Sequence, residues 1–341
     1  MNGRRLFLDE GPGERRGVVT LDGRPERLLI ERTDAARGPR LGARYAARAE
    51  EIAPGLRLAY LDLGCGEIAV MPLGREPQLH RGALIEVEII AEARAEKAAV
   101  ARTLGPESGP PRRLAPSPSL SDRLAVMAPG ETILAAPDAR EIADEAEEAA
   151  LAVDHAFAGG LRLSVETTRA LTAVDIDWAG AARPSARAAM EANRRGLRES
   201  ARLLRLKAIG GAVVIDLIGF PAEGKLLQAA AREAFAPDGP GVTVLAPSRL
   251  GLLQLAKPHR ETPVRELLLA PDGRLSARSV AQRLARALAR EGRADPGARL
   301  VAAASPETAT ALRPLLAELG PRFGVEEALG WDRLKTDIRK A

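Results

Sequence analysis

The order of apolar and polar positions in the first third of the chain is typical of short β-strands. Residues 17–32, GVVTLDGRPERLLIER, place two apolar runs around Asp22-Gly23, a dipeptide suited to a type I′ turn, and predict a β-hairpin. Further apolar runs follow between residues 39 and 105, and each ends at Gly, Pro or a charged turn: ARYAARAEEI, LRLAYLDLG, EIAVMPLG and ALIEVEIIAEA. Four or five short strands in this length predict a small β-barrel or an OB fold.

The pattern changes after residue 105. Residues 105–122, GPESGPPRRLAPSPSLSD, are rich in proline and serine and predict a linker. A helix is expected over residues 138–153, with Asp138 as its cap. The segments GGLRLSVETT, RALTAVDID, a long helix and GGAVVIDLIGF then predict the order strand, strand, helix, strand.

The long helix is the clearest element of the sequence. Pro184 stands at its expected first position, and Gly210-Gly211 marks its end. One face carries an apolar stripe that predicts packing on the sheet: Met190, Leu197, Ala201 and Leu204. A different face carries four arginines: Arg194, Arg198, Arg202 and Arg205. This row is either a track for RNA phosphates or a solvated face paired to Glu191 and Glu199.

The last part of the chain alternates helix and strand patterns and predicts a separate small α/β module. The whole chain is therefore expected to divide into five parts. These are an N-terminal hairpin (1–35), a barrel (36–105), a linker (106–124), a central α/β region (125–262) and a C-terminal α/β domain (263–341). No internal repeat is evident.

Composition adds limits to this picture. The 341 residues, of which 46% are hydrophobic and 28% charged, are typical of a soluble protein of two or three domains. The 50 Lys and Arg against 46 Asp and Glu slightly favour polyanionic partners. A single cysteine, Cys65, excludes an internal disulfide and a multi-cysteine zinc site, and fits a reducing compartment. Because no apolar run is long enough to span a membrane, we expect a cytoplasmic protein.

Three aspartates carry the most specific chemical signal. In ALTAVDIDWAG, Asp175 and Asp177 lie on the same side of a strand. Asp216 ends the strand after the long helix, and such a strand, helix and strand usually pair in parallel. Asp175 and Asp216 then meet at one edge of the sheet, where they can hold a divalent cation. The alternative is that each aspartate only caps a turn.

Other chemistries have weaker support. His80, His155 and His259 are scattered and have no metal-ligand spacing. The sequence has neither a phosphate loop of the Gly-x-x-x-x-Gly-Lys type nor a serine nucleophile elbow. Cys65 has no obvious base beside it.

The motifs around the aspartates resemble the catalytic segment of the ribonuclease E/G family. They are ETTRALTAVDIDWAG, EANRRGLRESARLLRLKAIGGAVVIDLIGF and SRLGLLQL. The family has a Thr-Ala-x-Asp-x-Asn strand, a helix ending in Leu-x-x-Gly-Gly, an Ile-Asp strand and a Ser-Arg-x-Gly-Leu-Leu run. VTLDGRPERLLIE resembles its opening hairpin, and PGLRLAYLDLGCGEIAVMPL its OB domain. The resemblance covers most of residues 17–105 and 125–256.

The resemblance implies a multidomain α/β (α+β) fold, with an OB-fold barrel inserted in an RNase H-like and DNase I-like catalytic region. It implies an endoribonuclease that cuts single-stranded RNA, such as rRNA or tRNA precursors. Asp175 and Asp216 would bind Mg²⁺ or Mn²⁺, which holds the scissile phosphate and activates a water, leaving a 5′-phosphate and a 3′-hydroxyl. Asp177, counted with the catalytic residues, replaces the family's Asn; its carboxylate either adds a ligand or repels the phosphate.

The resemblance also assigns RNA contacts on the barrel. Tyr60 matches an aromatic residue that stacks a base, and the alternative is an ordinary core tyrosine. Val70 replaces a second family aromatic. Lys97 matches a basic residue near the RNA path, and simple solvation is the alternative.

Two departures from the family define a short, ribonuclease G-like form. The proline-rich linker replaces the subdomain that senses the 5′-monophosphate, so such sensing is not expected. The Cys-x-x-Cys zinc link is absent, so we expect no zinc and no zinc-linked tetramer, while a homodimer stays open. Two alternatives to an active ribonuclease are an RNA-binding protein with weak or lost cleavage and, with less support, a metal-dependent DNA nuclease.

Overall fold

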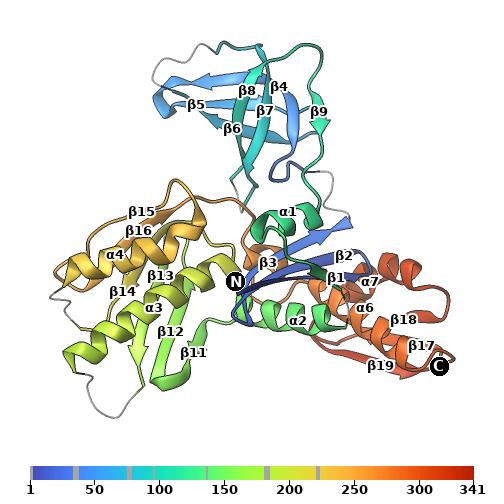
Figure 1. Ribbon diagram of the computed structural model, residues 1–341. Helices are drawn as coiled ribbons and strands as arrows, with labels where there is room; N and C mark the ends of the chain where they lie inside the picture. The colour runs from blue at the N-terminus through green and yellow to red at the C-terminus, as the bar shows by residue number, and fades with distance from the viewer. Residues whose placement is uncertain are drawn as a thin grey trace.

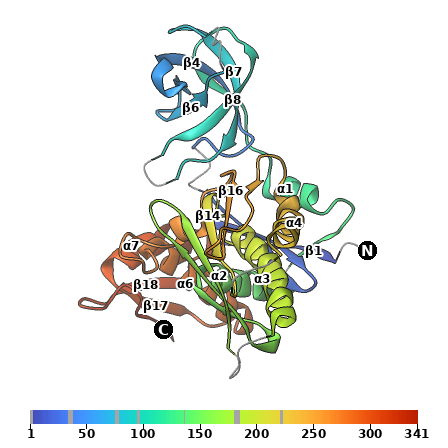
Figure 2. The same cartoon turned by 90° about the vertical axis from the view of Figure 1, so that its left-hand side faces the viewer.

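A β-barrel stands apart from a larger body in both views of the computed structural model (Figures 1 and 2). The structure describes residues 3–33, 38–74, 79–94, 97–135, 137–179, 185–219 and 223–341. The body has an N-terminal sheet at its centre, with an α/β layer on one side and the C-terminal module on the other (Figure 1). No helix among the described residues has both the length and the apolar character needed to cross a membrane.

The N-terminal sheet has the strand order β10-β1-β2-β3. Its strands are β1 (Arg4–Gly11), β2 (Glu14–Leu21), β3 (Arg24–Arg32) and β10 (Ile133–Leu134). The predicted hairpin is confirmed: Asp22 and Gly23 both have positive φ, 50° and 79°, as a type I′ turn requires. Alternating side chains pack one sheet face on helix α1 (Leu120–Met127) and the other on helix α2 (Asp138–Leu151).

The predicted small barrel is also confirmed. Its strands are β4 (Arg44–Ala53), β5 (Leu58–Asp62), β6 (Ile68–Pro72), β7 (Leu84–Ala91) and β8 (Ala99–Pro106), and η2 (Pro54–Leu56) joins the first two. They pair in the order β5-β6-β8-β7-β4, and β4 closes the barrel by pairing with β5. Tyr45, Leu61 and Ile89 fill the core together with several alanines.

Residues 106–124, expected to be a linker, contain regular structure. Strand β9 (Arg112–Ala115) pairs with β4 at the edge of the barrel sheet, and α1 begins at Leu120. Pro110 and Pro111 precede the strand and do not interrupt it, and Ser119 forms a capping box with Asp122. The prolines and serines therefore mark the ends of elements here. The domain boundaries drawn from the sequence stay a prediction.

The main α/β layer is a six-stranded sheet of order β11-β12-β13-β14-β16-β15. Its strands are β11 (Asp154–Ala156), β12 (Leu161–Thr167), β13 (Thr172–Trp178), β14 (Gly211–Asp216), β15 (Thr243–Val244) and β16 (Leu252–Lys257). Its helices are α3 (Ala186–Leu206) and α4 (Gly224–Phe235), with short turns η3 (Ala158–Gly160) and η4 (Ala236–Asp238). The predicted order of strand, strand, helix and strand is confirmed.

The helix ends differ in detail from the predictions. Helix α3 begins at Ala186 with Ser185 as its side-chain cap, and the expected role of Pro184 falls outside the described residues. The cap predicted for α2 is wrong: Asp138 is the first helical residue, and the N-cap position is Pro137, which has no side-chain cap. The apolar stripe of α3 packs as predicted, with Leu197, Ala201 and Leu204 fully buried and Met190 partly buried.

The C-terminal module is α/β, as predicted. After α5 (Val264–Leu268) it contains α6 (Ala277–Ala294), β17 (Leu300–Ala304), α7 (Pro306–Leu319), β18 (Phe323–Glu327) and β19 (Thr336–Lys340). Its sheet, of order β18-β17-β19, has its own core with α6 and α7. Buried ion pairs nevertheless join α6 to the body, because Arg286 contacts both Glu14 on β2 and Glu147 on α2.

Candidate active site

Asp175 and Asp216 lie side by side on neighbouring strands. Strands β13 and β14 pair in parallel, with helix α3 as their crossover, and Asp175 is the register partner of Asp216. Neighbouring strands lie about 4.8 Å apart, so one ion can reach both carboxylates. The predicted parallel pairing, which places the two aspartates at the same edge, is confirmed.

The carboxylates face the open side of the sheet. Along β13, Val174 and Ile176 are buried on the side of α3, whereas Asp175 and Asp177 are exposed on the other side. Solvent therefore reaches the aspartates, although Asp175 remains partly desolvated. The same exposure allows a polymer backbone to approach them.

The electrostatics of the pair fit a bound cation. Burial, followed by the charges of Asp177 and Asp216, raises the pKa of Asp175 above its ordinary value. Among the described residues, no basic side chain forms an ion pair with any of these three aspartates. It also contains no cluster of three or more acidic, histidine or cysteine side chains that could hold a metal. Mg²⁺ needs only one or two carboxylates, because waters or phosphates complete its shell.

Asp177 has a different environment from Asp175. Its Oδ1 accepts a hydrogen bond of 2.7 Å from the backbone N–H of Trp178. One carboxylate oxygen is thus engaged by its own strand, while its negative charge still acts on Asp175. The structure therefore supports an electrostatic role for Asp177 more directly than a role as a ligand.

Asn193 fixes the loop that follows Asp216. This helix α3 residue is 2% exposed, and its amide makes two bonds to the backbone of Ile218. Oδ1 accepts from the N–H at 2.8 Å, and Nδ2 donates to the carbonyl at 3.1 Å. Asn193 was not among the residues predicted from the sequence. The signal in the sequence was a polar residue beside the apolar helix positions Ala192 and Leu197.

The SRLGLL motif forms a turn beside the same strand end. The Ser248 hydroxyl accepts from the N–H groups of Leu250 and Leu252, and the Gly251 carbonyl accepts from the N–H of Leu217. This turn carries Arg249, an exposed cation that the sequence analysis also missed. Its position within a motif next to the strand end was the signal for it.

Gly210 and Gly211 allow the chain to re-enter the sheet. A Cβ at Gly210 would lie 2.8 Å from the Pro258 carbonyl oxygen and from His259 Cα. Gly211 has φ +93°, and a Cβ there would lie 2.8 Å from the His259 ring. Only glycine permits this approach, so the Gly-Gly pair sets where β14 starts and hence where Asp216 ends it.

Part of the chain matches a known protein family. Residues 118–260 match the sequence profile of the Ribonuclease E/G family. This segment is similar to the ribonuclease E/G family domain. The match contains the three aspartates, Asn193 and the SRLGLL turn, and it lies outside the barrel strands β4 to β9 and the C-terminal module. No curated protein matches the chain.

The arginine row of the ribonuclease E/G domain does not form an exposed track. Arg202 is 8% exposed and pairs with Glu199, while Arg205 is 5% exposed and pairs with Glu26 and Asp238. Arg198 is exposed near Glu191, at 3.8 Å, and Arg194 is half-buried. The structure corrects the expected row of four, because two of its guanidinium groups are held in buried ion pairs.

The barrel residues named from the sequence lie outside the ribonuclease E/G domain. Tyr60 on β5 is half-buried and faces outward opposite Val70, whereas Ala59 and Leu61 fill the core. The core tyrosine is Tyr45 instead. Lys97 is exposed and pairs through its backbone with Arg94. The structure thus leaves both predicted contacts accessible.

Proposed function

We propose that the protein is an endoribonuclease that cuts single-stranded RNA at a divalent cation held by Asp175 and Asp216. The family domain indicates ribonuclease chemistry. The observation that carries the proposal is the parallel register of Asp175 with Asp216 on an open sheet face. Two carboxylates in this register, without a basic ion-pair partner among the described side chains, are as many as Mg²⁺ usually takes from a protein, and waters or phosphates would complete its shell.

Each residue of the site has a distinct part in the proposed reaction. Asp175 and Asp216 hold the cation, which supplies Lewis acidity toward the phosphate and a nucleophile at neutral pH. Asn193 keeps the loop after Asp216 in place through Ile218. Arg249 presents a positive charge beside the same strand end, where it can contact the RNA backbone.

The barrel supports a single-stranded substrate. Strands β6 and β8 pair in parallel within an otherwise antiparallel closed barrel, and we interpret this connectivity as an OB fold. Tyr60 presents an aromatic ring on the outer face of β5, where it can stack a base for about 1–3 kcal/mol. Lys97, exposed between β7 and β8, can add a contact to the RNA phosphates.

The test is a cleavage assay on a short, 5′-labelled, A/U-rich single-stranded RNA. With Mg²⁺ or Mn²⁺ the wild-type protein should cut this RNA, and Asp216→Asn should slow cleavage by at least about 100-fold, because a metal ligand is lost. Binding of the same RNA in EDTA should stay within a few-fold. Equal cleavage of duplex DNA, or no cleavage with either metal, would contradict the proposal.

A second function, RNA binding with weak or lost cleavage, is favoured by one observation. The charge of Asp177 lies close enough to raise the pKa of Asp175, and the same charge opposes a phosphate. If this function is correct, the wild-type protein binds the RNA without cutting it, and Asp177→Asn restores cleavage.

A further inference from the structure

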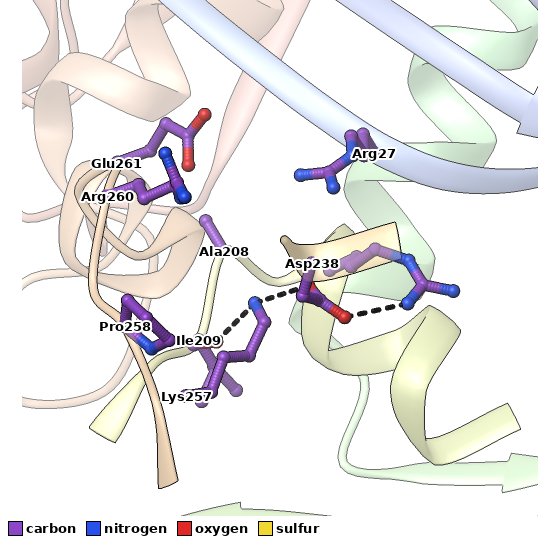
Figure 3. Close-up of a pocket in the computed structure, with 9 residues that line it drawn as sticks. Arg27, Ala208, Ile209, Asp238, Lys257, Pro258, Arg260 and Glu261 are labelled. Carbon is purple, nitrogen blue, oxygen red and sulfur yellow. Dashed lines mark hydrogen bonds and ion pairs between the residues drawn. The ribbon is translucent and has the colours of Figure 1, made fainter. Parts of the chain in front are cut away.

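A small pocket with a mostly charged lining lies between the N-terminal sheet and the main α/β layer (Figure 3). It is a cavity of about 30 Å³, formed by β3, the segment after α3, η4 and the end of β16. We call it the junction pocket and define it by its charged lining: Arg27, Arg205, Asp238, Lys257, Arg260 and Glu261. Its volume admits a water or the oxygens of a small oxyanion, and no base or sugar.

The junction pocket is separate from the candidate active site. In the pairing of β14 with β16, Lys257 lies opposite Gly211, whereas Asp216 lies opposite Leu252. The two positions are at opposite ends of the strands, about 17 Å apart at the usual rise per residue. An occupant of the pocket therefore cannot reach the reacting phosphate.

The acids of the pocket are already engaged. Asp238 accepts from Arg205 at 2.9 Å and from Lys257 at 3.1 Å, and it is almost completely buried between them. Glu261 contacts Arg123, which is not part of the lining, at 3.2 Å. The four cations of the lining thus outnumber its acids, and Asp238 serves two of them.

Among the residues that the structure describes, two guanidinium groups of the lining have no ion pair and no side-chain hydrogen bond. Arg27 on β3 and Arg260 after β16 point into the same space from different elements (Figure 3), and neither has an ion pair or side-chain hydrogen bond there. Burial lowers the pKa of Arg27, although Glu261 and Asp238 oppose this shift. A guanidinium stays charged in proteins, so Arg27 is a partly desolvated charge that an anion would stabilise.

The surroundings extend this positive region to the barrel. Burial and the charges of Arg94, Lys97 and Lys257 lower the pKa of His259 to about 4, which places these cations near one another. The loop that carries Arg260 is bonded to the barrel base, because the Glu92 N–H donates to the Arg260 carbonyl at 2.7 Å. The Glu92 carboxylate also accepts from Thr262. A ligand in the pocket would contact barrel and body together.

We propose that the junction pocket binds a phosphate group, with Arg27 and Arg260 as its ligands, and that in the cell this group belongs to RNA. The phosphate chemistry follows from the pocket itself, whereas the identity of the polyanion rests on the proposed function. The group is a backbone phosphodiester or a terminal monophosphate, since both present the same oxygens to paired arginines.

The first test uses inorganic phosphate and no RNA. Thermal unfolding is measured in phosphate and in chloride of equal ionic strength for wild type, Arg27→Gln, Arg260→Gln and Arg299→Gln. Arg299 is an exposed arginine of the C-terminal module and controls for lost charge. Phosphate should raise Tm by a few degrees more in wild type and Arg299→Gln than in the two pocket variants. Arg27→Gln leaves no described acid unpaired, so it should fold normally.

The second test measures RNA binding in EDTA, where cleavage does not interfere. Each pocket variant should bind about 5–10-fold more weakly, with a salt slope lower by about one. Equal losses on 5′-hydroxyl and 5′-monophosphate RNA identify a backbone phosphate, and a loss confined to 5′-monophosphate RNA identifies a terminal one. The proposal is overturned if the two pocket variants match Arg299→Gln both in the Tm increase caused by phosphate and in RNA affinity. If phosphate raises the Tm of wild type more than that of the pocket variants but wild type does not bind RNA, the phosphate site is supported and the proposed function is refuted.

Discussion

At the scale of single residues, the charge of Asp177 adds to burial in raising the pKa of Asp175. Asp177→Asn keeps an oxygen for the Trp178 N–H and removes only the charge. We expect the pKa of Asp175 to fall, although burial still raises it, and cleavage to become several-fold faster, because the phosphate is less repelled. Rates from pH 5 to 8 and an NMR titration check this. A loss as large as that of Asp175→Asn would show that Asp177 is a ligand.

Two partly buried histidines determine part of the pH dependence of stability. Burial, then Lys207 and Arg202, lower the pKa of His155 to about 4, and His259 is shifted to a similar value. The unfolded chain, with a histidine pKa near 6.5, takes up protons first as the pH falls. Stability should therefore decrease between about pH 6.5 and 4, by roughly 2 kcal/mol per histidine after allowance for partial exposure. Urea unfolding at pH 7 and 4.5 should show a smaller decrease for His155→Gln than for wild type.

At the scale of elements, the close contact between α3 and β13 positions the aspartates. A Cβ at Gly196 would lie 2.6 Å from the Ile176 side chain, which is the residue between Asp175 and Asp177. Alanine usually stabilises a helix interior relative to glycine by up to about 1 kcal/mol. We expect Gly196→Ala to destabilise the protein by about 1–3 kcal/mol instead, because the helix must move away from the strand. Gly55→Ala, with nothing within 4 Å of its Cβ, is the matched control for urea unfolding.

The same elements show what the sequence could predict. Apolar periodicity and turn residues were sufficient to predict the hairpin at Asp22-Gly23 and the barrel strands, because both depend on local sequence pattern. The pairing of Asp175 with Asp216 could be predicted because a strand, helix and strand usually return the chain in parallel. Periodicity could not show that Arg205 is buried. Its partners Glu26 and Asp238 come from distant segments, and only the fold brings them together. The function of the aspartates stays a prediction.

At the scale of the whole molecule, a buried ion network joins the N-terminal sheet, α2 and the C-terminal module. Glu147 on α2 is its centre, and it accepts from Arg16 at 3.0 Å, Arg283 at 2.7 Å and Arg286 at 3.2 Å. Arg16 lies on β2 and the other two arginines lie on α6. Although burial opposes it, the charges of Arg286, Arg283 and Arg16 lower the pKa of Glu147. Glu147 therefore supplies two of the buried ion pairs that attach the module, beside the pair of Arg286 with Glu14.

Glu147→Gln tests whether this network attaches the module. The substitution leaves three arginines facing a neutral amide, and loss of one partner from a buried ion network costs about 3–5 kcal/mol. The pKa of Glu147 is lowered in the folded protein, so its ionised form stabilises the fold above its ordinary pKa of 4.5. This stabilisation is lost as the pH falls through the folded-state pKa. The stability of Glu147→Gln should therefore depend less on acid than that of wild type. Hydrogen exchange should become faster in α6 and α2 but not in the barrel. Glu148→Gln, an exposed neighbour, should match wild type; equal unfolding of the two variants would show that other contacts hold the module.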